Sequence, residues 1–171
     1  ANLVAGDTNS TSDIFVHDLQ TGTTTRVSVD SSGSQSDNAS QTATISADGR
    51  YVVFSSAASN LVVGDTNGIG DLFVHDMQTG TTTRSSLGST GNQIAGNIKG
   101  FSISSDNRYI VFSSSDAGLV SGDTNGAYDV FVHDLQTGTT TRVSVDSAGT
   151  EGNSKSGEGY ISADGRYVVF S

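Results

Sequence analysis

The chain has no cysteine, no proline and no tryptophan among its 171 residues. The absence of cysteine excludes a disulfide framework and a thiolate metal site. Basic residues are scarce, since eight Lys and Arg stand against eighteen Asp and Glu and give a net charge of −10. Nucleic acids and anionic membranes require a positive face, so neither is expected as a partner, whereas divalent cations remain suitable. No apolar run approaches the roughly 18 residues of a membrane-spanning helix, so no span is predicted.

The chain is instead rich in internal repetition. The tetrapeptide GDTN begins at Gly6, Gly64 and Gly122, 58 residues apart each time. The segment FVHDLQTGTTTRVSVDS at 15–31 returns unchanged at 131–147. Self-similarity of this length at one fixed period indicates a propeller, a solenoid or an array.

Each 58-residue unit is expected to form four short β-strands, which in the second copy are 43–47, 50–56, 71–78 and 81–87. These segments are rich in Val, Ile, Phe, Tyr and Thr and are separated by turn residues, and none has a helical period. The turn ADG at 47–49 places Gly where a tight hairpin needs positive φ. Continuous apolar runs such as YVVF predict strands buried on both faces, as when each sheet lies between two others.

The sequence ISADGRYVVFSS followed by DLFVHDMQTGTTTR resembles the repeat of TolB-like, WD40-like (PD40-type) β-propellers, in which such a segment builds one four-stranded blade. The resemblance covers the whole chain three times. It implies an all-β fold, a β-propeller built from three 58-residue four-stranded blade repeats. The chain departs from the family where Ala47, Ser105 and Ala163 replace the common turn proline. Function does not follow from the fold, because propellers host many unrelated activities.

The repeat register places both chain ends inside one blade. Three units of 58 residues would make 174, three more than the chain has, and the missing three correspond to 56–58 of the second copy. One blade is therefore expected to be split between the N- and C-termini. The expected single repeat domain is 1–171, with blade halves 1–31 and 159–171 and full blades 43–90 and 101–148. The halves are expected to contain strands 13–20, 23–30, 160–163 and 166–171.

Propellers typically have four to eight blades, so three blades are not expected to close a ring within one chain. The two halves should then pair head-to-tail between chains, which makes the chain its own predicted partner. A six-bladed dimer, a filament, or a piece of a longer propeller are the three outcomes that the register allows.

The GDTN loops carry the candidate metal ligands. Oxygen side chains stand at positions i, i+2 and i+6 of each loop, and with backbone carbonyls and water they can surround one hard cation. Calcium is the predicted cofactor. The expected ligands are Asp7, Asn9, Asp13, Asp65, Asn67, Asp71, Asp123, Asn125 and Asp129. The alternative is an Asx turn, in which Asp and Asn bond their own backbone.

Three histidines, His17, His75 and His133, lie on the third strand of three different blades. They cannot converge on one ion, and the aspartate that follows each one points to the opposite face of the strand. We expect each histidine to be hydrogen-bonded and packed between blades. Three arginines are expected to pair with an acid or cap a sheet edge, and three aspartates to serve as turn acids: Arg26, Arg84 and Arg142, and Asp48, Asp106 and Asp164.

No nucleophile elbow and no glycine-rich phosphate loop occur, so no catalytic residue is predicted and the chain is not expected to be an enzyme. Repeat symmetry breaks in three variable loops, 32–41, 89–100 and 148–159. The last of these holds the only glutamates, Glu151 and Glu158, and its stretch EGNSKSGEG is expected to be flexible.

The favoured function is a calcium-stabilised structural propeller module that is extracellular or at the cell surface, with the periplasm as the other location. The start at Ala1 without Met fits a processed, secreted form. The alternative is a binding module, a lectin or a TolB-like protein-interaction propeller, that takes a glycan or protein on the variable loops.

Overall fold

The computed structural model describes residues 3–171, and these residues form twelve β-strands and no helix. No helix able to cross a bilayer therefore occurs in this part of the chain. The backbone groups into two compact units. One unit contains the residues up to Ile45 together with Gly49–Arg84, and the other contains Ser46–Asp48 together with Ser85–Ser171.

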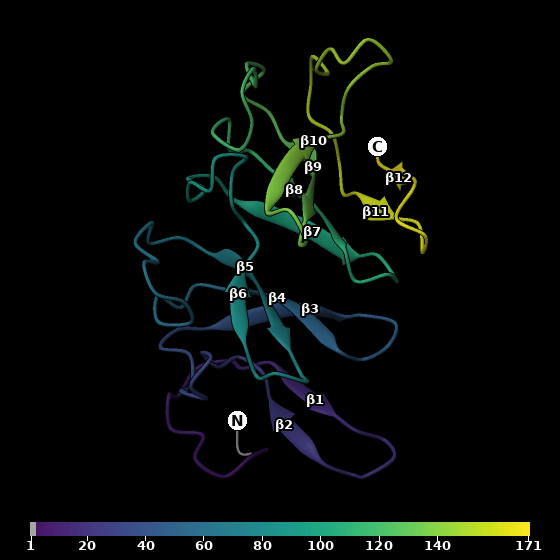
Figure 1. The fold of residues 1–171 in the computed structure, drawn as a ribbon. Helices are drawn as coiled ribbons and strands as arrows, with labels where there is room; N and C mark the ends of the chain where they lie inside the picture. The colour runs from purple at the N-terminus through teal and green to yellow at the C-terminus, as the bar shows by residue number, and fades with distance from the viewer. Residues whose placement is uncertain (1–2) are drawn as a thin grey trace. The chain divides into compact units, whose positions relative to one another are not determined.

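The first unit holds a two-stranded and a four-stranded sheet, both antiparallel (Figure 1). The four strands of the larger sheet pair in chain order, so each is joined to the next by a hairpin or a loop. The strands are β1 (Phe15–His17) and β2 (Thr24–Arg26) in the small sheet, and β3 (Ser40–Ile45), β4 (Tyr51–Ser56), β5 (Asp71–Asp76) and β6 (Thr82–Arg84) in the large one.

The second unit repeats the four-stranded arrangement and ends in another two-stranded sheet. Within it, β11 contacts β7 and β8. The strands are β7 (Ile98–Ile103), β8 (Tyr109–Ser114), β9 (Asp129–Asp134) and β10 (Thr139–Arg142) in the large sheet, and β11 (Tyr160–Ile161) and β12 (Val168–Val169) in the small one.

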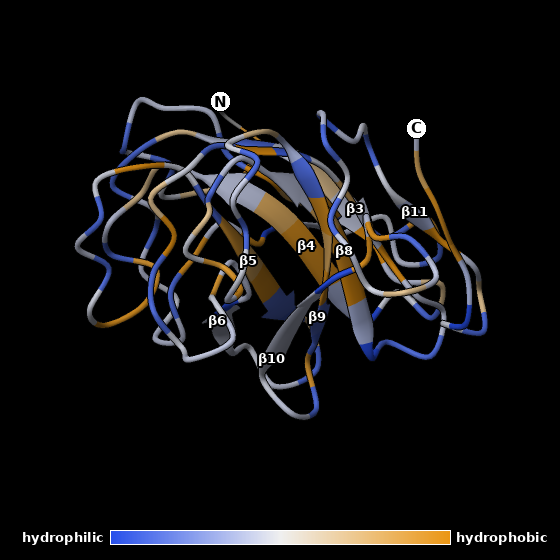
Figure 2. Cartoon of the chain, turned by 90° about the horizontal axis from the view of Figure 1, so that it is seen from above, coloured by the Kyte–Doolittle hydropathy of each residue, from blue (hydrophilic) through white to orange (hydrophobic). Residues whose placement is uncertain are grey.

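Each four-stranded sheet buries the apolar residues of its two central strands, and β4 and β8 are accordingly largely orange in Figure 2. In the first unit the ring centroids of Phe54 and Phe73 are 5.9 Å apart, and Val27, which follows β2, packs against the same cluster. In the second unit Phe112 and Phe131 form the equivalent pair at 5.8 Å. The apolar runs of the sequence are therefore buried on both faces, as predicted.

Left-handed backbone appears where the sequence predicts tight turns, with φ of 74° at Gly49 and 62° at Asn107. A second recurrent position was not anticipated. The pairing of β3 with β4 and of β7 with β8 is interrupted by a bulge, and the extra residue has positive φ, 42° at Thr42 and 50° at Gly100. The bulge bends the first strand of each sheet.

The all-β prediction and the four-stranded sheets are confirmed, and residues 3–171 contain no closed sheet. Several predicted bounds need correction. Strand β6 ends at Arg84 rather than 87, and Leu87 pairs instead with Gln93 in an isolated bridge. Strand β3 starts at Ser40 rather than 43, because the bulge lets pairing continue past Thr42. Strand β5 ends at Asp76 rather than 78, because the Asp76 carboxylate accepts the Gln78 N–H and turns the chain. The four terminal strands are shorter than predicted, and each belongs to a sheet of only two strands. Closure of a split blade stays a prediction.

Candidate functional site

Each GDTN loop folds over an arginine that ends the last strand of its sheet. In the first copy, Nη1 of Arg26 lies 3.3 Å from Oδ1 of Asp7 and 3.7 Å from Oδ2 of Asp13. The other two copies repeat this arrangement, with Arg84 at 3.1 Å from Asp65 and 3.6 Å from Asp71, and Arg142 at 3.6 Å from Asp123 and 3.9 Å from Asp129. The prediction that these arginines pair with neighbouring acids is confirmed.

These charges are taken out of water. The three arginine side chains are at most 11% exposed, and the second aspartate of each loop is fully buried. A buried ion pair is strongly destabilised when one partner is removed, because the other charge is left without compensation. The arginine and its two acids therefore form one structural unit that fastens the loop to the sheet.

The asparagine of each loop forms the Asx turn that the sequence left open as an alternative. Oδ1 of Asn9 accepts the Thr11 N–H at 3.2 Å, and its Nδ2 donates to Oδ1 of Asp13 at 3.3 Å and to the Ser36 carbonyl at 3.0 Å. Asn67 and Asn125 make the equivalent turn, to the N–H groups of Ile69 and Ala127. The asparagine oxygen is thus already used by the backbone.

The nine predicted ligands lie in three sets, one in each GDTN loop, and their role as ligands stays a prediction. In each set a guanidinium offsets one carboxylate, and this lowers the attraction for a cation. The first two loops therefore fit calcium poorly.

The third loop carries one acid more than the other two. Oε2 of Glu151 lies 2.7 Å from Nη1 of Arg142 and accepts the Thr124 N–H at 3.1 Å. Carboxylate oxygens of Asp123, Asp129 and Glu151 all lie within 4.8 Å of one another. Burial, together with the charges of Asp129 and Glu151, raises the pKa of Asp123.

Sequence reasoning missed Glu151 and placed it in a flexible stretch. The structure instead holds it in an isolated β-bridge with Val145. The overlooked signal was the repeat register, because Glu151 stands where the other copies have the neutral residues Gln35 and Gln93. The third loop is consequently the most negative of the three.

The histidines bind threonines on the neighbouring strand. Nδ1 of His75 lies 2.9 Å from Oγ1 of Thr82, and that hydroxyl donates to the Val29 carbonyl at 2.5 Å. Because the threonine proton is committed to Val29, Nδ1 of His75 is the donor. Burial lowers the pKa of His75 and of His133. His17 makes the same bond to its threonine but is exposed. The three side chains belong to separate sheets, so they form no common site.

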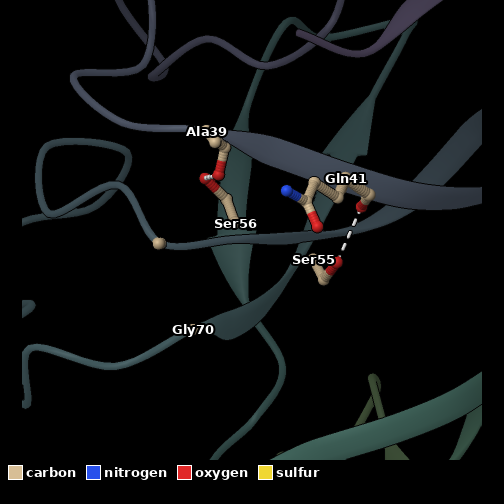
Figure 3. Close-up of a pocket in the computed structure, with 6 residues that line it drawn as sticks. Ala39, Gln41, Ser55, Ser56 and Gly70 are labelled. Atoms are coloured by element: carbon tan, nitrogen blue, oxygen red, sulfur yellow. Dashed lines mark hydrogen bonds between the residues drawn. The ribbon is translucent and has the colours of Figure 1, made fainter. Parts of the chain in front are cut away.

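A small cavity recurs at one end of the large sheets. In the first unit it encloses about 180 Å³ beside Ala39, Gln41, Ser55, Ser56 and Gly70, and Ser55 Oγ donates to the Gln41 carbonyl at 2.7 Å (Figure 3). The second unit has a larger version of about 290 Å³, in which Lys99, Ser113 and Tyr128 stand in the register of Gln41, Ser55 and Gly70.

The larger cavity is lined by several residues that break the repeat symmetry. Lys99 and Lys155, the two lysines of the chain, both line it, together with Glu158. Nζ of Lys99 lies 4.5 Å from the centre of the Tyr128 ring. An acidic chain therefore concentrates its lysines beside an aromatic ring and several hydroxyl groups.

No protein-family model matches the chain, and no curated protein matches it. Several solved structures do resemble it. The TolB protein of Acinetobacter baumannii has a TM-score of 0.55 at 19% identity, over 92% of this chain and 31% of that one. A TolB structure from Agrobacterium tumefaciens has a TM-score of 0.53 at 19% identity, over 93% of this chain and 50% of that one. The tricorn protease has a TM-score of 0.59 at 16% identity, over 95% and 13%.

These similarities confirm the resemblance to TolB-like β-propellers at the level of the fold. The chain spans half or less of the length of each matched structure. One of the matched proteins is a protease, but the matched part is 13% of that chain. Neither proteolysis nor any other activity is carried over to this chain by such a match.

Proposed function

We propose that this chain is a non-enzymatic structural β-propeller module, extracellular, at the cell surface or in the periplasm, that assembles head-to-tail with copies of itself. The observation that carries the proposal is the pair of half-sheets. By register, β1 and β2 correspond to β5 and β6, whereas β11 and β12 correspond to β3 and β4. Together the two small sheets contain the four strands of one blade.

Both half-sheets expose groups that the complete blades bury. Val53 and Phe54 of β4 are fully buried, whereas the equivalent Val169 and Phe170 are 67% and 38% exposed. The open strand edges also carry unpaired backbone groups, which favour pairing with another strand. Assembly between copies would cover these apolar side chains and complete the sheet.

Sedimentation or light scattering on the purified chain tests the proposal. A dimer of twice 17.5 kDa or a larger head-to-tail polymer is expected, and electron microscopy separates rings from filaments. Deletion of 167–171 should abolish either assembly. A stable, folded monomer at micromolar concentration would refute the proposal.

Calcium stabilisation is part of the proposal and concerns chiefly the third loop. Three carboxylates against one guanidinium leave that cluster with two excess negative charges, compared with one in the other loops. A chelator should lower the melting temperature, and the substitutions Asp123→Asn and Glu151→Gln should reduce that response. The double variant Asp65→Ala/Asp71→Ala tests the second loop in the same way, by the change in melting temperature that the chelator causes. A melting curve that excess EDTA leaves unchanged would remove calcium from the proposal.

The cavity of the second unit favours a second candidate function, a binding module for a glycan or protein. Two lysines, a tyrosine ring and serine hydroxyls suit a ligand with a carboxylate or sulfate group. A glycan array with acidic and neutral sugars is the direct test. Binding that Lys99→Ala and Lys155→Ala abolish, while Lys99→Arg retains part of it, would support this function. No binding to any array member would leave the structural module alone.

A further inference from the structure

One ion pair recurs in both complete blades. The guanidinium of Arg50 donates to the Asp76 carboxylate from Nε at 3.1 Å and from Nη2 at 2.8 Å. Arg108 binds Asp134 at the same two distances. This pair connects the second strand of the blade to the third, since Arg50 precedes β4 and Asp76 ends β5. Both aspartates are less than a tenth exposed.

The third copy of this pair is divided between the two half-sheets. Asp18 is the register equivalent of Asp76, and Arg166 is the equivalent of Arg50. Both side chains are exposed, and within residues 3–171 neither has an ion-pair partner. Their conformations are nevertheless those of the complete blades. Asp18 accepts the Gln20 N–H at 2.8 Å, and Arg166 stacks at 4.9 Å from the centre of the Tyr167 ring, as Arg50 stacks on Tyr51 at 4.8 Å.

We infer that Arg166 of one copy binds the partner's Asp18, in a composite blade where β12 runs antiparallel to the partner's β1. This inference rests on the proposed self-assembly and assigns its register. The pairing of β4 with β5 provides the template, in which Tyr51 faces Asp76, Val53 faces Val74 and Phe54 faces Phe73. In the composite blade Tyr167 faces the partner's Asp18, Val169 faces the partner's Val16, and Phe170 faces the partner's Phe15.

A second, independent contact supports the same partner. Thr82 donates to the Val29 carbonyl of the preceding sheet, and Thr140 donates to the Leu87 carbonyl in the same way at 2.5 Å. Both threonines are 4% exposed, whereas the equivalent Thr24 is half-buried. The register equivalent of Val29 and Leu87 is Val145, in the other half of the chain. Thr24 of one copy therefore donates to the partner's Val145 carbonyl when the composite blade forms.

Apolar matching reinforces the electrostatic match. Leu19 is 93% exposed, whereas its equivalent Met77 packs against the core of the first unit. The Met77 N–H donates to the Arg50 carbonyl at 2.8 Å, so the Leu19 N–H has its acceptor in the partner's Arg166 carbonyl. The two half-sheets thus complement each other in charge, in exposed apolar side chains and in backbone donors and acceptors.

Charge reversal tests the assigned pair. The variants Asp18→Arg and Arg166→Asp should each weaken association by roughly tenfold or more, because each juxtaposes like charges across the interface. The double variant Asp18→Arg/Arg166→Asp should recover association. An equimolar mixture of the two single variants should also recover it, since both interfaces of the mixed dimer then join Arg to Asp. Asp164→Arg, a reversal on an exposed turn acid near the same end, is the matched control and should leave association unchanged.

Disulfide trapping provides a second measurement that needs no effect on affinity. The chain has no native cysteine, so every disulfide that forms must join introduced cysteines. Under mild oxidation Val16→Cys with Val169→Cys should form dimers or polymers linked between chains. Val16→Cys with Val168→Cys is the off-register control, because neighbouring strand residues point to opposite faces. Cross-linking of Val16→Cys alone would reveal that β1 pairs with β1, and that would overturn the inference.

Self-assembly and the assigned register are refuted by different results. A wild-type chain that stays monomeric refutes self-assembly and this register together. A wild-type chain that associates, with single reversals as tight as wild type or with no recovery in the mixture, refutes the register and leaves self-assembly standing. Association weakened by both single variants, recovered in the mixture and trapped at residues 16 and 169, supports the inference.

Discussion

Replacing Arg142 by glutamine should expose how much the buried acid cluster of the third loop depends on one guanidinium. Nη1 of Arg142 lies 2.7 Å from Glu151, 3.6 Å from Asp123 and 3.9 Å from Asp129, and the side chain is 9% exposed. At an effective dielectric constant of about 20, unit charges 3–4 Å apart attract by roughly 4–6 kcal/mol. Desolvation offsets much of this, and removal of one partner from a buried pair costs about 3–5 kcal/mol. We expect a loss of unfolding free energy in that range at pH 7.

The loss should shrink as the pH falls. The pKa of Asp123 is already raised in the folded state, so the folded protein binds more protons than the unfolded one between the ordinary pKa of an aspartate and the raised value. Stability in that window increases on acidification. Removing Arg142 raises the pKa of Asp123 further and extends the window upward, so the variant should recover part of its deficit between pH 7 and pH 5.

Urea denaturation at the two pH values, at fixed protein concentration, measures both effects. Lys155→Gln removes an exposed cation and serves as the control, with an expected change below about 0.5 kcal/mol. The double variant Arg142→Gln/Glu151→Gln should recover roughly 1–2 kcal/mol, as expected for coupled neighbours. A deficit under about 1 kcal/mol, or one that grows towards pH 5, would contradict the electrostatic account.

Three further substitutions test the packing and the backbone, each by chemical denaturation. Phe54→Ala removes a fully buried ring that packs against Phe73, and it should cost about 3–5 kcal/mol; a cost below about 1 kcal/mol would contradict the core assignment. Thr42→Gly should stabilise the fold by roughly 0.5–1 kcal/mol, because the bulge holds a β-branched residue at φ of 42° where the next blade has Gly100; a destabilised variant would argue against strain there. His75→Gln should cost about 0.5–3 kcal/mol and leave any ligand binding intact. Because burial lowers the pKa of His75, the wild-type contribution should be lost as the pH falls below about 6.5, a dependence that the variant should lack.

The sequence predicted the features that repeat and missed those that depend on contacts between distant residues. The period, the apolar runs and the positive φ at Gly49 follow from local chemistry, and the structure has them all. The sequence predicted that Arg26 pairs with an acid. It did not predict that the pair with Asp7 is buried, because burial depends on how the loop folds over the sheet. The bulge at Thr42 could not be predicted from its own residue, because a β-branched side chain disfavours the positive φ that the bulge requires.

Glu151 is a second residue whose role depends on contacts with distant segments. Its neighbours in sequence are small and polar, which suggests an unstructured loop, whereas its partners Thr124 and Arg142 come from other segments. Comparison with Gln35 and Gln93 in the other copies would have marked the position as special. The three repeats can therefore be aligned with one another. Positions where the copies differ, such as Glu151 against Gln35 and Gln93, are the ones that indicate a contact specific to one copy.

The identity of segments 15–31 and 131–147 has a consequence for how the chain folds. Strand β8 can pair during folding with its own β9 or with the equivalent segment 13–18 of another molecule, which differs from β9 only in having Ile14 where β9 has Val130. Contact energy therefore distinguishes the two segments poorly, and the higher effective concentration of the tethered segment, of the order of millimolar, favours the correct choice. Refolding at high protein concentration should therefore yield exchanged, entangled chains, and dilution should restore the native connectivity.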